Sequence, residues 1–188
     1  MKIIKKMAFI ACIAILSQSA VIAQDSKEKT VMVGGAAMYP SKNIIENAVN
    51  SKDHTTLVAA VKAADLVATL ESAGPFTVFA PTNAAFDKLP KGTVETLLKP
   101  ENKSMLAGIL TYHVVSGKFG SAEIAALIKK GNGKAEIKTV AGGILTASMK
   151  GKDLILTDEK GGTSMVTIKD VNQSNGVIHV VNAVLMHK

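Results

Sequence analysis

The sequence predicts a single domain of the α+β class, with helices in its first two thirds and strands in its last third. A chain of 188 residues with 47% apolar residues is long and apolar enough to bury one sizeable core. Apolar positions recur at helical spacing from residue 43 to residue 130, and short β-type runs separated by glycine-containing turns follow from residue 134. Helices and strands that are segregated along the chain in this way are typical of α+β domains.

Residues 1–23 have the three-part organisation of a secretory signal peptide, and we expect them to be removed on export. Three lysines precede an apolar run from Met7 to Leu16, and Val21-Ile22-Ala23 offers a cleavage site. The run is shorter than the roughly 20 apolar residues that span a bilayer, and an uncleaved N-terminal anchor is the alternative. The sequence therefore predicts a secreted protein that starts near Gln24.

The chain that remains after cleavage contains neither cysteine nor arginine. Its only cysteine, Cys12, lies inside the apolar run, so we expect neither disulfides nor thiolate chemistry, and export without disulfides favours a bacterial periplasm, cell surface or medium. Loss of Lys2, Lys5 and Lys6 lowers the formal net charge from +7 to +4. Lysines scattered along a chain with few aromatics predict no nucleic-acid binding, although a weak attraction to anionic polymers is compatible with them.

Residues 24–42 are polar and then glycine-rich, and we interpret them as a flexible leader to a domain at 43–188. Helical periodicity predicts helices over 43–49, 55–71, 83–89, 93–98, 100–111 and 121–130. Thr55 or Thr56 is the expected cap of the second of these helices, and Ser121 of the last. Strands are expected over 76–80 and 112–117, and then over the closely spaced runs 135–140, 143–149, 153–158, 164–171 and 176–186, which indicate an antiparallel meander or sandwich.

The stretch "FTVFAPTNAAF" predicts a corner at which a buried strand turns into a short helix. Proline ends the strand because it cannot continue a central strand, and Thr82 or Asn83 can cap the helix that follows. Such residues also suit binding loops, but we interpret this corner as architecture. The residues expected to build it are Phe76, Phe79, Pro81, Thr82, Asn83 and Phe86.

Three blocks of the sequence resemble signature blocks of the fasciclin-like domain family. "GPFTVFAPTNAAFDKLP" is similar to the first block, "LTYHVVSGKF" to the central Tyr-His stretch, and "SNGVIHVVNAVLM" to the second block. The blocks follow the family's order and separations, and the match covers roughly residues 43–188. The resemblance implies a fasciclin-like β-sandwich or wedge of about seven strands, with helices packed on one side.

The resemblance also implies one binding candidate and two structural residues. Tyr112 and His113 match the Tyr-His stretch, which has been proposed as an integrin contact in animal members of the family. His179 and Asn182 belong to the second block and are expected to be structural. The apolar neighbours of His113 and His179 predict buried rings that are satisfied by hydrogen bonds within the protein.

No catalytic site, cofactor or metal site is predicted. No histidine pairs with another histidine or cysteine at metal-ligand spacing, and there is no nucleophile-elbow motif. The carboxylates are scattered, and we expect Asp153 and Asp158 to face solvent. The predicted function is that of an exported, non-enzymatic interaction module that mediates cell-surface or matrix adhesion by binding a protein or glycan. The alternative is a periplasmic small-molecule binding or carrier domain with a pocket between helices and sheet.

Overall fold

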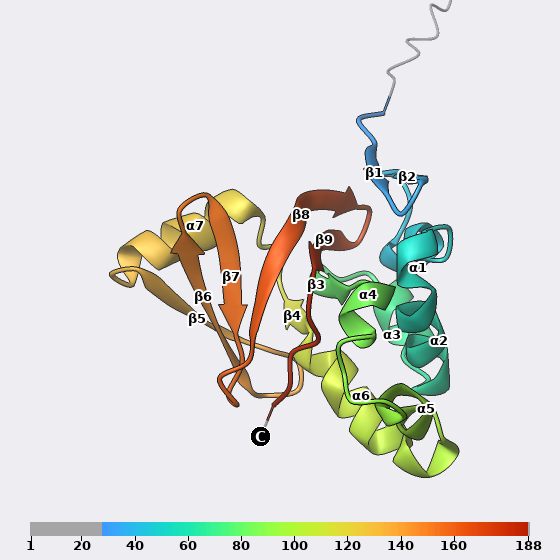
Figure 1. The fold of residues 1–188 in the computed structure, drawn as a ribbon. Coiled ribbons are helices and arrows are strands. Elements are labelled where there is room, and N and C mark those ends of the chain that lie inside the picture. Colours follow the sequence, from blue (N-terminus) through green and yellow to red (C-terminus); the bar gives the residue numbers. More distant parts are fainter. Residues whose placement is uncertain (1–27, 188) are drawn as a thin grey trace, which may run out of the picture.

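The computed structural model describes residues 28–187, so the predicted signal peptide lies outside the described residues. These residues form the α+β domain that the sequence predicts (Figure 1). The helices are α1 (Ile44–Ala48), α2 (Thr55–Ala63), α3 (Val67–Glu71), α4 (Asn83–Phe86), α5 (Thr93–Leu97), α6 (Lys103–Tyr112) and α7 (Ser121–Lys130), with 3₁₀ turns η1 (Lys52–His54) and η2 (Pro100–Asn102). The strands are β1 (Val31–Val33), β2 (Ala36–Met38), β3 (Phe76–Pro81), β4 (Val114–Ser116), β5 (Lys134–Lys138), β6 (Ile144–Lys150), β7 (Asp153–Thr157), β8 (Thr163–Gln173) and β9 (Gly176–Val181).

Seven strands form one curled sheet in the order β4-β3-β9-β8-β7-β6-β5. Strands β5 to β9 form the predicted antiparallel meander, and β3 joins it by pairing in parallel with β9. The chain that follows β5 returns to the opposite edge, where Val140 N–H donates to the Val114 carbonyl over 2.8 Å. The sheet is therefore a near-barrel, and the sandwich description in the sequence-based prediction was too coarse.

The alternation of side chains along β3 separates two hydrophobic cores. Val78 and Ala80 point into a core that they share with α1 to α6, whereas Phe79 between them points into a second core. The second core lies between the curled sheet and α7, and α7 contributes Ile124 and Ile128 to it. Helices α1 to α6 thus occupy one side of the sheet, as the resemblance implies, and α7 covers the other core (Figure 1).

Residues 31–38 form a β-hairpin, and the prediction of a flexible leader over 24–42 was wrong for this part. Val33 and Met38 are only 2% and 3% exposed and belong to the first core. Gly34 and Gly35 both have positive φ angles, as the tight turns of two-residue hairpins require. A glycine pair between two short apolar runs is a hairpin signal, and it was present in the sequence.

Two of the expected helix caps are replaced by side chains from elsewhere in the fold. The Asn83 carboxamide accepts from the Thr56 N–H at the start of α2 over 3.0 Å, while neither Thr55 nor Thr56 is the N-cap. Ser121 is the first residue of α7 rather than its cap, and its N–H donates to the Asp170 carboxylate over 2.6 Å. Within residues 28–187, no helix is long and apolar enough to cross a membrane.

Candidate functional site

Tyr112 and His113 lie at the junction where α6 ends and β4 begins, and both side chains are buried, at 0% and 2% exposed. The helix ends here because His113 takes the C-cap position, with its N–H donating to the Leu110 carbonyl over 3.0 Å. After this junction the chain forms β4, the edge strand that pairs with β3. The candidate binding pair therefore faces the interior of the domain.

His113 is a neutral ring whose two nitrogens have fixed roles. The Leu185 N–H donates to Nε2 over 3.0 Å, so Nε2 carries no hydrogen, and Nδ1 donates to the Ile109 carbonyl at 2.9 Å. Burial lowers the pKa of His113 to about 4, and the Ile109 carbonyl opposes this shift only in part. The ring therefore connects α6 to the C-terminal segment without carrying a charge at neutral pH.

Tyr112 connects the same junction to the start of β6 and to the turn after β7. Its hydroxyl donates to the Ile144 carbonyl over 2.7 Å and accepts from the Glu159 N–H over 3.3 Å. Its ring lies against that of His187, with centroids 5.5 Å apart. Burial and the nearby Glu159 carboxylate raise the pKa of Tyr112 to about 12, so the phenol remains a hydrogen-bond donor.

His179 on β9 is 0% exposed and stacks on Phe79 of β3, with ring centroids 5.7 Å apart. The Asp170 N–H donates to Nδ1 over 3.3 Å, and Nε2 donates to the Phe119 carbonyl over 2.9 Å. Burial lowers the pKa of His179, although the Phe119 carbonyl and the Asp170 charge oppose the shift. Both ring nitrogens therefore have hydrogen-bond partners within the protein.

The irregular register of β8 places the Asp170 carboxylate at the start of α7. Asp170 has a φ of 61°, and the pairing of β8 with β9 shifts on either side of Ile168. This geometry aims its carboxylate at the start of α7, where both the N–H and the hydroxyl of Ser121 donate to it. Burial alone would raise the pKa of Asp170, but the Ser121 bonds and the His179 and Lys169 charges outweigh that effect and lower it.

The C-terminal segment after β9 is held by a carboxylate that the sequence did not reveal. Asp158 is 8% exposed, contrary to the expectation that it faces solvent. Its side chain accepts from the Lys160 and Gly162 N–H groups of its own turn, at 3.0 and 2.7 Å, and from the Met186 N–H at 2.9 Å. The turn pattern was visible in "DEKGG", but the segment that covers it is distant in sequence.

The corner after β3 has the structure that the sequence predicts. Pro81 is the last residue of β3, and the Thr82 hydroxyl accepts from the Ala85 N–H over 3.2 Å as the cap of α4. Phe79 and Phe86 are buried, and Phe76 is half-buried against the first core. The Asn182 side chain accepts from the Met165 N–H over 2.9 Å. None of these polar side chains is directed toward a common site.

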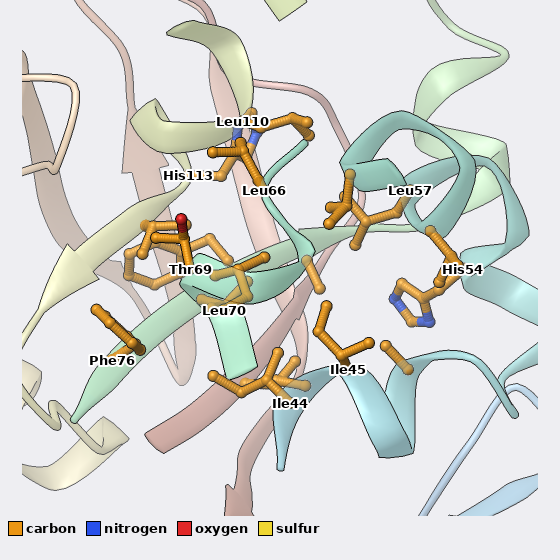
Figure 2. A pocket seen from close by; sticks show the side chains of 18 of the residues that line it. Ile44, Ile45, His54, Leu57, Leu66, Thr69, Leu70, Phe76, Leu110 and His113 are labelled. Carbon is orange, nitrogen blue, oxygen red and sulfur yellow. The ribbon is translucent and has the colours of Figure 1, made fainter. Parts of the chain in front are cut away.

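A small apolar cavity of about 60 Å³ lies between α1, α2, α3, α6 and β3 (Figure 2). His54 lines it, and its Nε2 is the one buried side-chain nitrogen or oxygen within residues 28–187 that lacks a hydrogen-bond partner. Its Nδ1 lies 2.9 Å from the Ser51 hydroxyl. Burial lowers the pKa of His54, while the nearby Ala80 carbonyl opposes this shift without making a well-aligned hydrogen bond.

The described residues contain no group of three or more His, Cys, Asp or Glu side chains placed to hold a metal ion. The rings of His113 and His179 bind different partners, so the structure does not bring them together with a carboxylate into a cleft. The arrangement can therefore connect elements of the fold through neutral, satisfied groups, and His54 adds a single available nitrogen at a small apolar cavity.

The protein-family model described as "Fasciclin domain" matches residues 52–187, which are most of the described chain. The chain belongs to the fasciclin domain family. Two relatives show how widely its sequence is shared. It is 46% identical over 162 residues to Protein sll1483 of Synechocystis sp., covering 86% of this chain and 83% of that protein. It is 37% identical over 144 residues to the immunogenic protein MPB70 of Mycobacterium bovis, covering 74% and 66%.

Larger animal proteins contain a region similar to this fasciclin domain. Human periostin is 31% identical over 134 residues, which are 71% of this chain but 14% of periostin. A solved FAS1 domain pair from the insect cell adhesion molecule fasciclin I has the same fold, with a TM-score of 0.71 at 15% identity, covering 79% of this chain and 52% of that one. The Tyr-His junction, the corner and the β9 histidine thus lie within a fasciclin domain whose fold is shared with a cell adhesion molecule.

Proposed function

We propose that this fasciclin domain is an exported, non-enzymatic interaction module that mediates cell-surface or matrix adhesion by binding a protein or glycan. The observation that supports this proposal is the inward orientation of the motif residues. His113, Tyr112 and His179 donate to or accept from main-chain groups, and their pKa values favour the neutral forms. Groups committed in this way build a scaffold and leave recognition to its surface.

Tyr112 and His113 act in this proposal by positioning other segments. Together they contact the chain at Ile144, Glu159 and Leu185. Direct contact between a partner and either side chain requires local opening of this junction, because both are buried. If Tyr112 and His113 form a binding site, their partner should associate faster with a variant in which this junction opens more readily.

Adhesion is tested with beads that carry the purified protein and with intact cells of its source. We expect saturable attachment that excess soluble protein abolishes, whereas beads coated with an unrelated protein of similar charge do not attach. Non-saturable attachment, or attachment that soluble protein does not compete, contradicts the proposal. Export is tested separately by the N-terminal sequence of the protein recovered from the periplasm or medium, which we expect to begin near Gln24.

The alternative, a small-molecule binding or carrier domain, is supported by the cavity and by the unpartnered Nε2 of His54. The small volume of the cavity makes this function the second choice. Drug-sized ligands occupy roughly 300–1,000 Å³, and even benzene fills an engineered cavity of about 150 Å³, whereas this cavity measures about 60 Å³. Native mass spectrometry of the protein purified from its source tests this alternative, and a stoichiometric small molecule in place of an adhesive partner would reverse the ranking.

A further inference from the structure

The net positive charge of the described residues is concentrated in one half of the chain. Residues 28–112, which supply α1 to α6, contain eight lysines and eight acidic residues and are balanced. Residues 113–187 contain nine lysines and six acidic residues, so this half carries the excess charge. All of that excess lies between residues 129 and 153, where six lysines accompany two acidic residues, since the remainder of this half has three lysines and four acidic residues. Charge asymmetry of this kind points to an anionic partner.

The fold brings five of these lysines to one end of the domain, which we call the lysine end: Lys129, Lys130, Lys134, Lys150 and Lys152. Helix α7 ends at Lys130, and β5 begins at Lys134. Lys134 pairs with Ser148, so Lys150 lies two residues farther along β6, about 7 Å along the strand. Figure 1 shows the end of α7, the start of β5 and the β6–β7 turn together on the left, away from α1 to α6.

The ammonium groups of the lysine end are available to a partner. All five side chains are exposed, and the ion pair found within residues 28–187, between Lys103 and Asp65, lies in the helical half. Two acidic side chains accompany them: Asp153 pairs opposite Lys150 in the strand register, and Glu136 follows on the exposed face of β5. The lysine end thus has an excess of positive charge even after both carboxylates are counted.

Purely structural roles explain only part of the lysine end. Lysines in the last turn of α7 interact favourably with the helix dipole, and Lys134 on the edge strand β5 discourages pairing with another chain. Neither reason applies to Lys150 and Lys152, which flank Gly151 in the tight turn between two inner strands. These two lysines extend the positive surface across the turn.

We propose that the lysine end binds a linear polyanionic polysaccharide, an inference that rests on the proposed adhesive function and specifies its partner. Single-stranded nucleic acid is disfavoured because no aromatic side chain accompanies these lysines for base stacking. A membrane surface is disfavoured because an interfacial helix needs a free apolar face, whereas Ile124 and Ile128 of α7 are turned into the second core. A chain of regularly spaced anions can contact lysines on all three elements at once.

The test compares two double variants of the full chain that lose the same charge. K150Q/K152Q alters the lysine end, and K91Q/K99Q removes two exposed lysines of the helical half. Binding to heparin, to alginate and to neutral dextran is measured by titration calorimetry at several salt concentrations. For the unaltered protein we expect binding to heparin and alginate, none to dextran, and on the order of a hundredfold loss of affinity between 50 and 200 mM salt.

We expect K150Q/K152Q to weaken binding about tenfold and to reduce the slope of log affinity against log salt by roughly 0.7–0.9 for each lysine. K91Q/K99Q should bind like the unaltered protein. A second variant of the lysine end, K129Q/K130Q, should repeat the loss, and equal thermal unfolding of all variants shows that the fold is retained. Equal weakening by both double variants means that net charge alone acts, and this overturns the proposal.

Two further measurements separate the proposal from its rivals. Vesicles that contain phosphatidylglycerol should bind more weakly than the polysaccharides, and tighter binding to vesicles assigns the surface to a membrane and overturns the inference. In the bead assay, K150Q/K152Q should attach less than K91Q/K99Q. If K150Q/K152Q beads attach fully and remain competed by soluble protein, the adhesive function stands and the lysine end is not its site.

Discussion

Replacement of His113 by glutamine should remove a large part of the acid sensitivity of this domain. The ring is buried, and its pKa is lowered from 6.5 to about 4, so the folded state excludes a proton that the unfolded chain binds. A histidine with a lowered pKa stabilises the fold fully above about pH 6.5 and loses that contribution as the pH falls toward 4. The free energy of unfolding should therefore decrease through this interval.

The size of the effect follows from the two pKa values. Proton linkage gives a loss of about 2 kcal/mol between pH 7 and pH 5, and about 3 kcal/mol by pH 4, from this ring alone. The physical cause is burial of the ring, which disfavours its charged form and which the Ile109 carbonyl opposes only in part. Protonation of Nε2 also removes the acceptor of the Leu185 N–H. The pKa values of His54 and His179 are also lowered by burial, so the variant should retain a smaller dependence of the same sign.

Urea unfolding followed by circular dichroism at intervals between pH 7 and pH 4.5 measures this effect. H113Q should be less stable at pH 7, because a glutamine side chain does not reproduce the rigid ring that bonds both the Ile109 carbonyl and the Leu185 N–H. It should then lose about 2 kcal/mol less than the unaltered protein on going to pH 5. F86A is the control, since it destabilises the fold without removing a titrating group. Parallel curves for H113Q and the unaltered protein would refute the assignment of His113 as the acid-sensitive contact.

Three sets of substitutions test the packing described above. Phe86→Ala should cost roughly 3–5 kcal/mol, since this side chain is 6% exposed in the first core, and an unchanged melting temperature contradicts that placement. Asn83→Ala should cost about 1–2 kcal/mol in urea unfolding, because the Thr56 N–H at the start of α2 loses its acceptor; Asn83→Asp, which keeps an acceptor oxygen, should recover part of it. Gly34→Ala should destabilise the hairpin more than Gly35→Ala does, because a Cβ at Gly34 lies 2.7 Å from a backbone nitrogen whereas Gly35 faces open space; equal melting temperatures argue against the close approach.

Local patterns predicted those parts of the fold that depend on neighbouring residues. Alternation and glycine turns revealed the strands after residue 134, and the cap at Thr82 followed from a proline and two short polar residues. The parallel pairing of β3 with β9 could not be derived in this way, because a strand pattern does not specify which distant strand it pairs with. The resemblance to the fasciclin domain family implied about seven strands with helices on one side, but it did not specify this parallel pair.

The surroundings of the candidate site were predictable only where burial followed from apolar neighbours. His113 and His179 were placed correctly inside the domain for that reason. Asp158 was misplaced, since an aspartate before a glycine turn usually faces water, and the chain that covers it arrives from Met186. The unpartnered nitrogen of His54 left no signal in the sequence, because it depends on how several helices pack around a cavity.

The wall that β3 and β9 form between the two cores has a consequence for how the protein is made. Phe76 pairs with Gly176 and Pro81 with Val181, so the strand that separates the cores pairs with a strand that lies far later in the sequence. A nascent chain that has not yet produced residues 176–181 leaves both cores open along that wall. Contacts of such long sequence separation form slowly, so we expect this wall to close late in folding.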